Sequence, residues 1–309
     1  MQLPAFAPWA WILIVLAAAV LQTVRNAAQR TLTAELGTLP ATLVRFLYGL
    51  PFALVWLLLV LHYLPVQNAP PVFTPQYFVW LVLGAVAQIA ATAFLLLAMQ
   101  ERNFVIGVAL AKTEVLQVAL LATVLLFEMP TAWGAVAMVC ATMGVVLISM
   151  PKTVGKGEIS TGWHSKAALA GLASGACFAL ASVGYRGAAL TQPGVSAWVI
   201  GAWGVLLAQA IQTLLMGGWI GFREPGKLMA IARAWRLSSL AGAMGAMASI
   251  GWFTAFALRP AADVKTLGLV EVIFSYAVSR KLFDEKLSGK ERLGLLLVTV
   301  GLVVICAQL

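Results

Sequence analysis

The sequence is poor in charged residues. Lysine, arginine, aspartate and glutamate make up 10% of its 309 residues, whereas hydrophobic residues make up 62%. Soluble domains are about half apolar and about a quarter charged, so a water-soluble fold of this length has no way to bury so much apolar surface. A bilayer removes that need, and each helical span then requires about 20 mostly apolar residues. The composition therefore predicts an integral membrane protein.

Histidine and cysteine are also scarce, and both are scattered. The two histidines lie in or near loops, and the three cysteines lie in separate apolar runs without paired spacing. This pattern predicts no disulfide framework, no metal site and no cofactor. The formal charge of +9 does not indicate a nucleic-acid partner, because the cations lie between apolar runs, as they do in the cytoplasmic loops of membrane proteins.

Long apolar runs account for nearly the whole chain. Lipid offers the backbone no hydrogen bonds, so each run is predicted to be a helix and the fold class is all-α integral membrane. Ten transmembrane helices are predicted, at residues 9–32, 41–62, 77–99, 104–127, 131–150, 166–190, 194–218, 237–257, 262–283 and 289–308. Pro51 is expected to kink the second helix. After Pro225, the segment KLMAIARAWRL is compatible with a short interfacial helix or with a solvated loop.

The two halves of the chain are similar to each other. A shift of 157 positions aligns identical residues at matching places in the last three predicted helices of each half: Ala98 with Ala255, Arg102 with Arg259, Glu114 with Glu271, Glu128 with Glu285, and Gly144 with Gly301. We therefore expect two five-helix repeats, at residues 1–150 and 166–309, joined by a loop at 151–165. Five helices per repeat place the copies in opposite orientations across the membrane, as in transporters with a substrate site near the midplane.

Two segments carry a resemblance to a known family. GVALAKTEVLQVALLATVLLFE (residues 107–128) and SIGWFTAFALRPAADVKTLGLVEVIFSYAVSRKLFDEKLSGKERLG (residues 249–294) resemble the EamA branch of the drug/metabolite transporter superfamily, and Pro40 followed by Arg45 also fits. The resemblance implies a multi-pass protein of the inner (cytoplasmic) membrane. It also implies export of small metabolites, often amino acids, typically by proton exchange through a midplane cavity between the repeats.

Loop charges predict the orientation. Lysine and arginine are concentrated in the odd-numbered loops, which places those loops in the cytoplasm and both termini outside. Some relatives in the superfamily have cytosolic termini, which is the opposite arrangement. Two fused repeats complete the pseudo-symmetric unit, so a monomer suffices, and a homodimer is equally compatible.

Charges inside a predicted span are costly and are therefore functional candidates. The deepest are Lys112, Glu114 and Glu271, about eight to ten residues into the fourth and ninth helices. Lys112 and Glu114 are two positions apart, which places them on different helical faces. Lys265 lies one turn before Leu269, the counterpart of Lys112. We expect the lysine face to meet a substrate carboxylate; the alternative is that Lys112 pairs permanently with a carboxylate on a neighbouring helix.

The acidic residues are candidates for proton coupling. A carboxyl group in a low-dielectric environment resists ionisation, so Glu114 and Glu271 can change protonation when substrate or water arrives. The alternative is a structural hydrogen bond or ion pair that joins the two repeats. Asp263, close after Pro260 at the start of the ninth helix, is a third candidate for proton coupling, unless it is simply interfacial.

Five further residues complete the predicted substrate site: Arg25, Arg45, Tyr48, Trp203 and Trp252. An arginine holds a carboxylate through two parallel hydrogen bonds, and aromatic rings form walls for an apolar or cationic solute. Arg45 and Arg186 lie close enough to helix ends to reach the interface instead, and most of the aromatic residues are expected to pack or to face lipid.

Other functions find less support in the sequence. An intramembrane enzyme is disfavoured because HExxH, paired-aspartate and GxSxG motifs are missing. A passive channel would need rings of like groups or a filter loop. Among transporters, the buried cations favour a carboxylate-bearing substrate, whereas the aromatic residues and glutamates favour a lipophilic cation, as in multidrug exporters.

Overall fold

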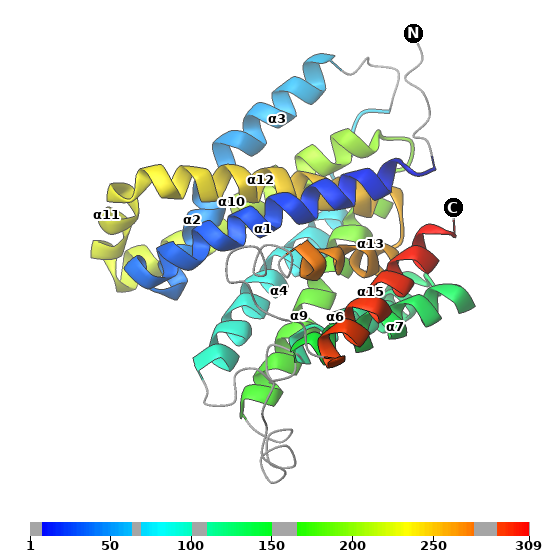
Figure 1. Cartoon of the computed structure of the whole chain (residues 1–309). Coiled ribbons are helices and arrows are strands. Elements are labelled where there is room, and N and C mark those ends of the chain that lie inside the picture. Colours follow the sequence, from blue (N-terminus) through cyan, green and yellow to red (C-terminus); the bar gives the residue numbers. More distant parts are fainter. Residues whose placement is uncertain (1–7, 64–68, 101–109, 150–165, 275–288, 309) are drawn as a thin grey trace. The chain divides into compact units, whose positions relative to one another are not determined.

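The structure is a computed structural model of the chain, and it describes residues 8–63, 69–100, 110–149, 166–274 and 289–308 (Figure 1). In these ranges the regular secondary structure is entirely helical. The helices are α1 (Ala10–Leu36), α2 (Thr38–Leu47), α3 (Leu50–Tyr63), α4 (Pro75–Gln100), α6 (Glu114–Leu126), α7 (Ala132–Ser149), α9 (Lys166–Leu190), α10 (Ala197–Arg223), α11 (Pro225–Arg233), α12 (Trp235–Leu258), α13 (Ala261–Gly268) and α15 (Gly289–Cys306).

Helix length and hydropathy confirm a multi-pass membrane protein of the all-α class. Seven described stretches are long and apolar enough to cross a bilayer: Ala10–Leu36, Thr38–Tyr63, Pro75–Ala98, Ala132–Ser149, Lys166–Leu190, Ala197–Arg223 and Trp235–Leu258. Large apolar side chains on these helices are exposed, among them Leu58 at 58% and Val79 at 65%, as expected for surfaces that face lipid.

The complete set of ten spans stays a prediction. The predicted spans 104–127 and 262–283 run partly outside the described residues. The span predicted at 289–308 corresponds to α15, an 18-residue helix that carries three charged residues near its start. The inverted arrangement of the two repeats as a whole also stays a prediction, as does the loop predicted at 151–165, which lies outside the described residues.

Two local predictions about helix boundaries can be compared directly with the structure. The expected interruption near Pro51 is present as a break, because α2 ends at Leu47 and α3 starts at Leu50. Pro51 is then the second residue of α3, where its missing N–H costs little. The segment after Pro225 is helical, which excludes the solvated-loop alternative.

The chain forms two compact units, which we describe separately. Unit 1 comprises residues 1–12, 87–183 and 260–309, and unit 2 comprises residues 13–86 and 184–259. Both units draw on both halves of the sequence. The boundaries of the two compact units therefore differ from those of the two predicted repeats.

In unit 1, α7 packs along α15 at very short range (Figure 1). A Cβ atom on Gly144 would lie 2.5 Å from the carbonyl oxygen of Gly294, and one on Gly301 would lie 2.7 Å from that of Ala137. These contacts show that α7 and α15 run antiparallel, with glycine allowing the backbones to touch. Gly144 and Gly301 are counterparts in the predicted repeat, so corresponding helices of the two halves face each other here.

In unit 2, α10 is the central helix and contacts α2, α3, α11 and α12. Small residues again set the spacing. Gly204 of α10 lies against the ring of Phe253, and Gly242 of α12 lies against the backbone of Tyr48, at the break between α2 and α3. Because α12 packs so closely on the break, this non-helical backbone is buried in protein, where membrane proteins tolerate it.

Candidate substrate and coupling site

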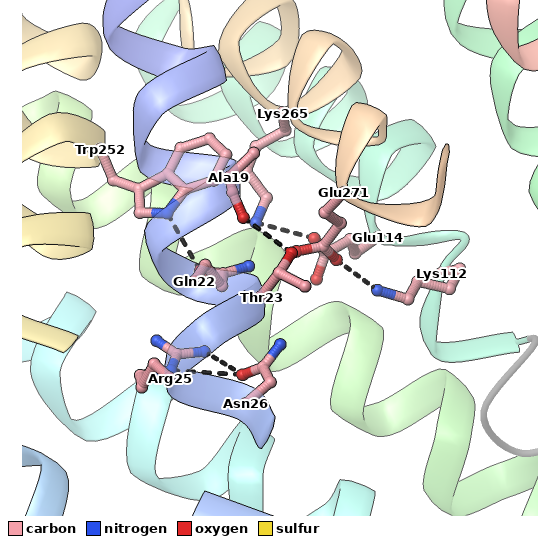
Figure 2. A network of polar contacts seen from close by, with 10 residues as sticks. All are labelled: Ala19, Gln22, Thr23, Arg25, Asn26, Lys112, Glu114, Trp252, Lys265 and Glu271. Carbon is pink, nitrogen blue, oxygen red and sulfur yellow. Dashed lines mark hydrogen bonds and ion pairs between the residues drawn. The ribbon is translucent and has the colours of Figure 1, made fainter. Parts of the chain in front are cut away.

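Four charged side chains in unit 1 form two ion pairs at α6 and α13 (Figure 2). Nζ of Lys112 lies 2.6 Å from Oε1 of Glu271, and Nζ of Lys265 lies 2.7 Å from Oε1 of Glu114. Each lysine therefore contacts the glutamate of the other segment. We call these four residues the lysine–glutamate cluster.

A turn in the backbone precedes α6 and positions the first half of the cluster. The chain turns at Lys112 and Thr113, and α6 begins at Glu114. The Thr113 hydroxyl donates a hydrogen bond to the carbonyl of Leu110 (2.6 Å) and accepts one from Nε2 of Gln117 (3.0 Å). Glu114 thereby occupies the first turn of a helix, where the helix dipole stabilises a carboxylate.

The corresponding segment of the second half has a similar construction. Lys265 lies in the last turn of α13, where a cation is favoured. Leu269 then forms a turn, and residues 270–274 are helical again, with Glu271 in their first turn. Leu269 is the counterpart of Lys112, so both interruptions fall at matching positions of the predicted repeat.

The cluster is electrically balanced and partly accessible. Its two positive and two negative charges compensate one another, which is the condition under which ionised groups remain inside a membrane protein. The two carboxylate side chains are each 15% exposed, whereas the side chain of Lys112 is 32% exposed and that of Lys265 is 19% exposed. The Lys112–Glu271 pair is therefore the more accessible of the two.

The sequence left open whether Lys112 pairs with a carboxylate on a neighbouring helix and whether the glutamates join the two repeats. Lys112 does pair with a carboxylate of another helical segment, and the pairs do join the two halves of the chain. Lys112 and Glu114 also have different partners. Roles in substrate binding and proton coupling stay predictions.

In unit 2, the predicted residues Arg25 of α1 and Arg45 of α2 converge on Gly245 of α12. A Cβ atom there would lie 3.2 Å from Cδ of Arg25 and 3.4 Å from Cγ of Arg45, so the glycine leaves room for both side chains. Arg25 is 6% exposed and donates from Nε (3.2 Å) and Nη2 (2.6 Å) to Oδ1 of Asn26 (Figure 2). The Arg45 guanidinium lies over the ring of Phe46, and its buried Nε has no hydrogen-bond partner among the described residues.

The predicted aromatic residues occupy different environments in unit 2. Tyr48 lies at the break between α2 and α3, and its hydroxyl donates to the carbonyl of Ile231 (3.2 Å). Trp252 donates from Nε1 to Oε1 of Gln22 (3.0 Å), as Figure 2 shows. Trp203 packs edge-on against Phe73, with ring centroids 5.1 Å apart, beside an apolar cluster formed by α3 and α10. These positions give Trp203 a clear packing role.

Two charged residues that the sequence singled out lie at helix ends. Asp263 is in the first turn of α13, where its charge complements the helix dipole. Arg186 is only 9% exposed, and its Nη1 donates to the carbonyls of Phe256 (2.6 Å) and Ala257 (3.3 Å) in the last turn of α12. Arg186 therefore caps a helix end rather than reaching the interface, because those carbonyls lack intrahelical partners.

Sequence reasoning missed two buried glutamines on α10. Gln209 is 3% exposed, and both polar atoms of its side chain lack hydrogen-bond partners within the described ranges. Gln212 is 1% exposed and donates to the carbonyl of Ala85 and the hydroxyl of Tyr185, both at 3.3 Å. The sequence feature that could have identified them is an amide side chain within a long apolar run. Such side chains in membrane helices form hydrogen bonds to neighbouring helices.

No cluster of three or more histidine, cysteine, aspartate or glutamate side chains in the described part of the chain is arranged to hold a metal ion.

Comparison with known proteins supports the fold. No model of a protein family matches the chain, and no curated protein matches it. One solved structure, described only as a crystal structure of a protein, superposes with a TM-score of 0.68 at 17% identity, covering 96% of this chain and 95% of the other. At that identity the similarity concerns the fold alone.

Proposed function

We propose that this chain is a secondary active transporter of the EamA type, located in the inner membrane, which exchanges protons for a small zwitterionic metabolite such as an amino acid. The observation that carries the proposal is the lysine–glutamate cluster. It places two cations and two carboxylates at interruptions of two helical segments, which is how transporters commonly build substrate and ion sites.

A zwitterion fits the Lys112–Glu271 pair chemically. Its carboxylate binds the ammonium group of Lys112 while its own ammonium group binds the carboxylate of Glu271. The inserted solute replaces one ion pair by two, so neither side chain is left as an uncompensated charge, which is costly inside a membrane.

The same arrangement couples transport to protons. A proton on Glu271 neutralises the group that would hold the substrate ammonium. Proton and substrate therefore compete for one carboxylate, and competition for a shared site is the requirement for exchange. Protonation also releases Lys112 from its partner, so the two states of the site differ in charge and in hydrogen bonding.

The second pair has a different role in this proposal. Lys265 is less exposed than Lys112, and its partner Glu114 is as buried as Glu271. We assign the Lys265–Glu114 pair as a permanent brace between the segments, which holds the more accessible pair in place while that pair opens.

Transport assays in proteoliposomes test the proposal. The internal pH is followed after addition of amino acids, organic acids or cationic drugs. We expect a pH change with zwitterionic amino acids that is lost in Glu271→Gln and in Lys112→Met, but retained in Lys166→Met, a matched change at an exposed lysine. Amino acid transport that survives in Lys112→Met contradicts the site. Transport of cationic drugs that survives in the same variant identifies the protein as a cation exporter instead.

A further inference from the structure

An apolar groove opens in unit 2 between α2, α10 and α11. Its volume is about 490 Å³, and its lining residues are Leu43, Leu47, Tyr48, Pro51, Thr213, Gly217, Leu228, Ile231 and Ala232. The hydroxyl of Tyr48 is already bonded to the carbonyl of Ile231. Leu47, Pro51 and Ala232 are exposed, so the groove reaches the surface of the unit. A groove with this lining accepts a hydrocarbon chain rather than a polar solute.

Cations lie on α11, which lines the groove, and in the residues that adjoin this helix. Leu228, Ile231 and Ala232 lie on one face of α11, and the helical period places Lys227 and Arg233 on either side of that face. Arg223 at the end of α10 and Arg236 at the start of α12 add two further positive charges. Glu224 is the one acidic residue between positions 219 and 236, so this segment has a net charge of +3.

The same segment has the features of a membrane interface. Arg223 stacks on Trp219 at 5.2 Å, and Arg236 stacks on Trp235 at 5.6 Å, measured to the ring centroids. Both tryptophan rings are more than half exposed, and Phe222 is 86% exposed. Tryptophan and arginine in this combination are typical of the headgroup level of a bilayer.

We propose that the groove holds one acyl chain of an anionic phospholipid, whose headgroup is bound by the cations of α11 and its neighbours. The occupant is a lipid because the groove is apolar and opens beside interfacial side chains. The lipid is anionic because the adjoining segment carries a net positive charge. This binding site is independent of the lysine–glutamate cluster and of the transported solute.

Photocrosslinking in vesicles tests the proposal. The protein is reconstituted in phosphatidylcholine vesicles that contain phosphatidylglycerol with a photoreactive acyl chain. We expect crosslinks to the lining residues of α2, α10 and α11, and little labelling by a phosphatidylcholine probe with the same acyl chain. Equal labelling by both probes would overturn the role of the headgroup charge.

Matched variants separate the groove from the rest of the surface. A Cβ atom at Gly217 would lie 3.9 Å from a methyl group of Leu43, whereas one at Gly218 has no neighbour within 4 Å. Gly217→Leu therefore fills the groove, and Gly218→Leu makes the same change outside it. We expect Gly217→Leu to lose the crosslinks and Gly218→Leu to keep them. Retained crosslinks in Gly217→Leu would contradict the groove as the site.

A second pair of variants tests the charges without altering the groove. Arg233→Gln together with Arg236→Gln removes two exposed cations, and Lys290→Gln together with Arg292→Gln makes the same charge change on α15. Each lost cation near an anionic surface weakens lipid binding about fivefold, so the first double variant should need about twenty-five times more phosphatidylglycerol for half-maximal labelling. An equal effect of the α15 variant would show a general charge effect and overturn the proposal.

Discussion

Removing the charges of the Lys112–Glu271 pair one at a time and then together distinguishes a purely structural ion pair from a substrate-binding site. The perturbations are Lys112→Met, Glu271→Gln and the double variant. In each single variant one partly buried charge loses its partner, which sits 2.6 Å away. Exposed ion pairs contribute about 0–1 kcal/mol, and breaking a fully buried pair costs about 3–5 kcal/mol. For side chains 32% and 15% exposed, we expect each single variant to lose about 2 kcal/mol.

The double variant should lose little more than either single variant. Once both charges are gone, no uncompensated charge remains, so the two losses should not add. The free energy of unfolding is measured by titration with sodium dodecyl sulfate for the unmodified protein and the three variants. Proton-coupled uptake is measured in proteoliposomes for the same four proteins. Losses that add to about 4 kcal/mol would show that the two side chains do not interact, and would refute the geometry.

The uptake measurements test whether the Lys112–Glu271 pair binds the solute. We expect the double variant to recover stability relative to the sum of the single losses but to remain inactive, because the site has lost both groups that hold the solute. The matched double variant Lys265→Met with Glu114→Gln should retain proton-coupled exchange at a reduced rate, because it keeps both groups that hold the solute but loses the pair that braces them. Normal exchange in the Lys112→Met, Glu271→Gln double variant would refute the proposed site.

Two further predictions concern helix packing and capping. Gly144→Leu should destabilise the protein by about 1–3 kcal/mol or more in the same detergent titration, because its Cβ would lie 2.5 Å from the carbonyl oxygen of Gly294. The control Gly218→Leu should change the free energy of unfolding by less than about 0.5 kcal/mol. Equal stability of the two variants would contradict the close contact of α7 and α15. Arg186→Met should lower the free energy of unfolding by about 1–3 kcal/mol, because it leaves the carbonyls of Phe256 and Ala257 without their donor. Arg186→Lys should recover part of that loss. Unchanged stability with lost transport would instead assign Arg186 to the substrate site.

Much of the fold could be predicted from the sequence because lipid makes simple demands on it. Runs of about 20 apolar residues have to be helical in a bilayer. The helices that lie close to their predicted positions are α1, α4, α7, α9, α10 and α12. The break near Pro51 and the helix after Pro225 also follow from local chemistry. The turns at Lys112 and at Leu269 were not predicted, because no proline lies beside either position and the single Gly268 before Leu269 is tolerated within helices.

The identity of the candidate residues was accessible for a similar reason. An ionised side chain inside an apolar run is costly, so Lys112, Glu114 and Glu271 could be singled out one by one. Gln209 and Gln212 were missed because an uncharged amide costs less to bury and therefore stands out less in an apolar sequence. Trp203 packs against Phe73 beside the apolar cluster of α3 and α10, and its predicted contact with the substrate stays a prediction.

By itself, the sequence determined that this is a multi-pass helical membrane protein, where most of its helices lie, and that Lys112, Glu114 and Glu271 lie within apolar runs. Only the tertiary structure decided the partners. Lys112 contacts Glu271, which is 159 positions away, rather than Glu114 beside it, and Arg25 meets Arg45 across the glycine of a third helix. Burial and helix formation depend on local composition, which can be read along the chain. Pairing depends on which helices pack together, and that is settled by close contacts such as those of Gly144 and Gly245 between segments distant in the sequence.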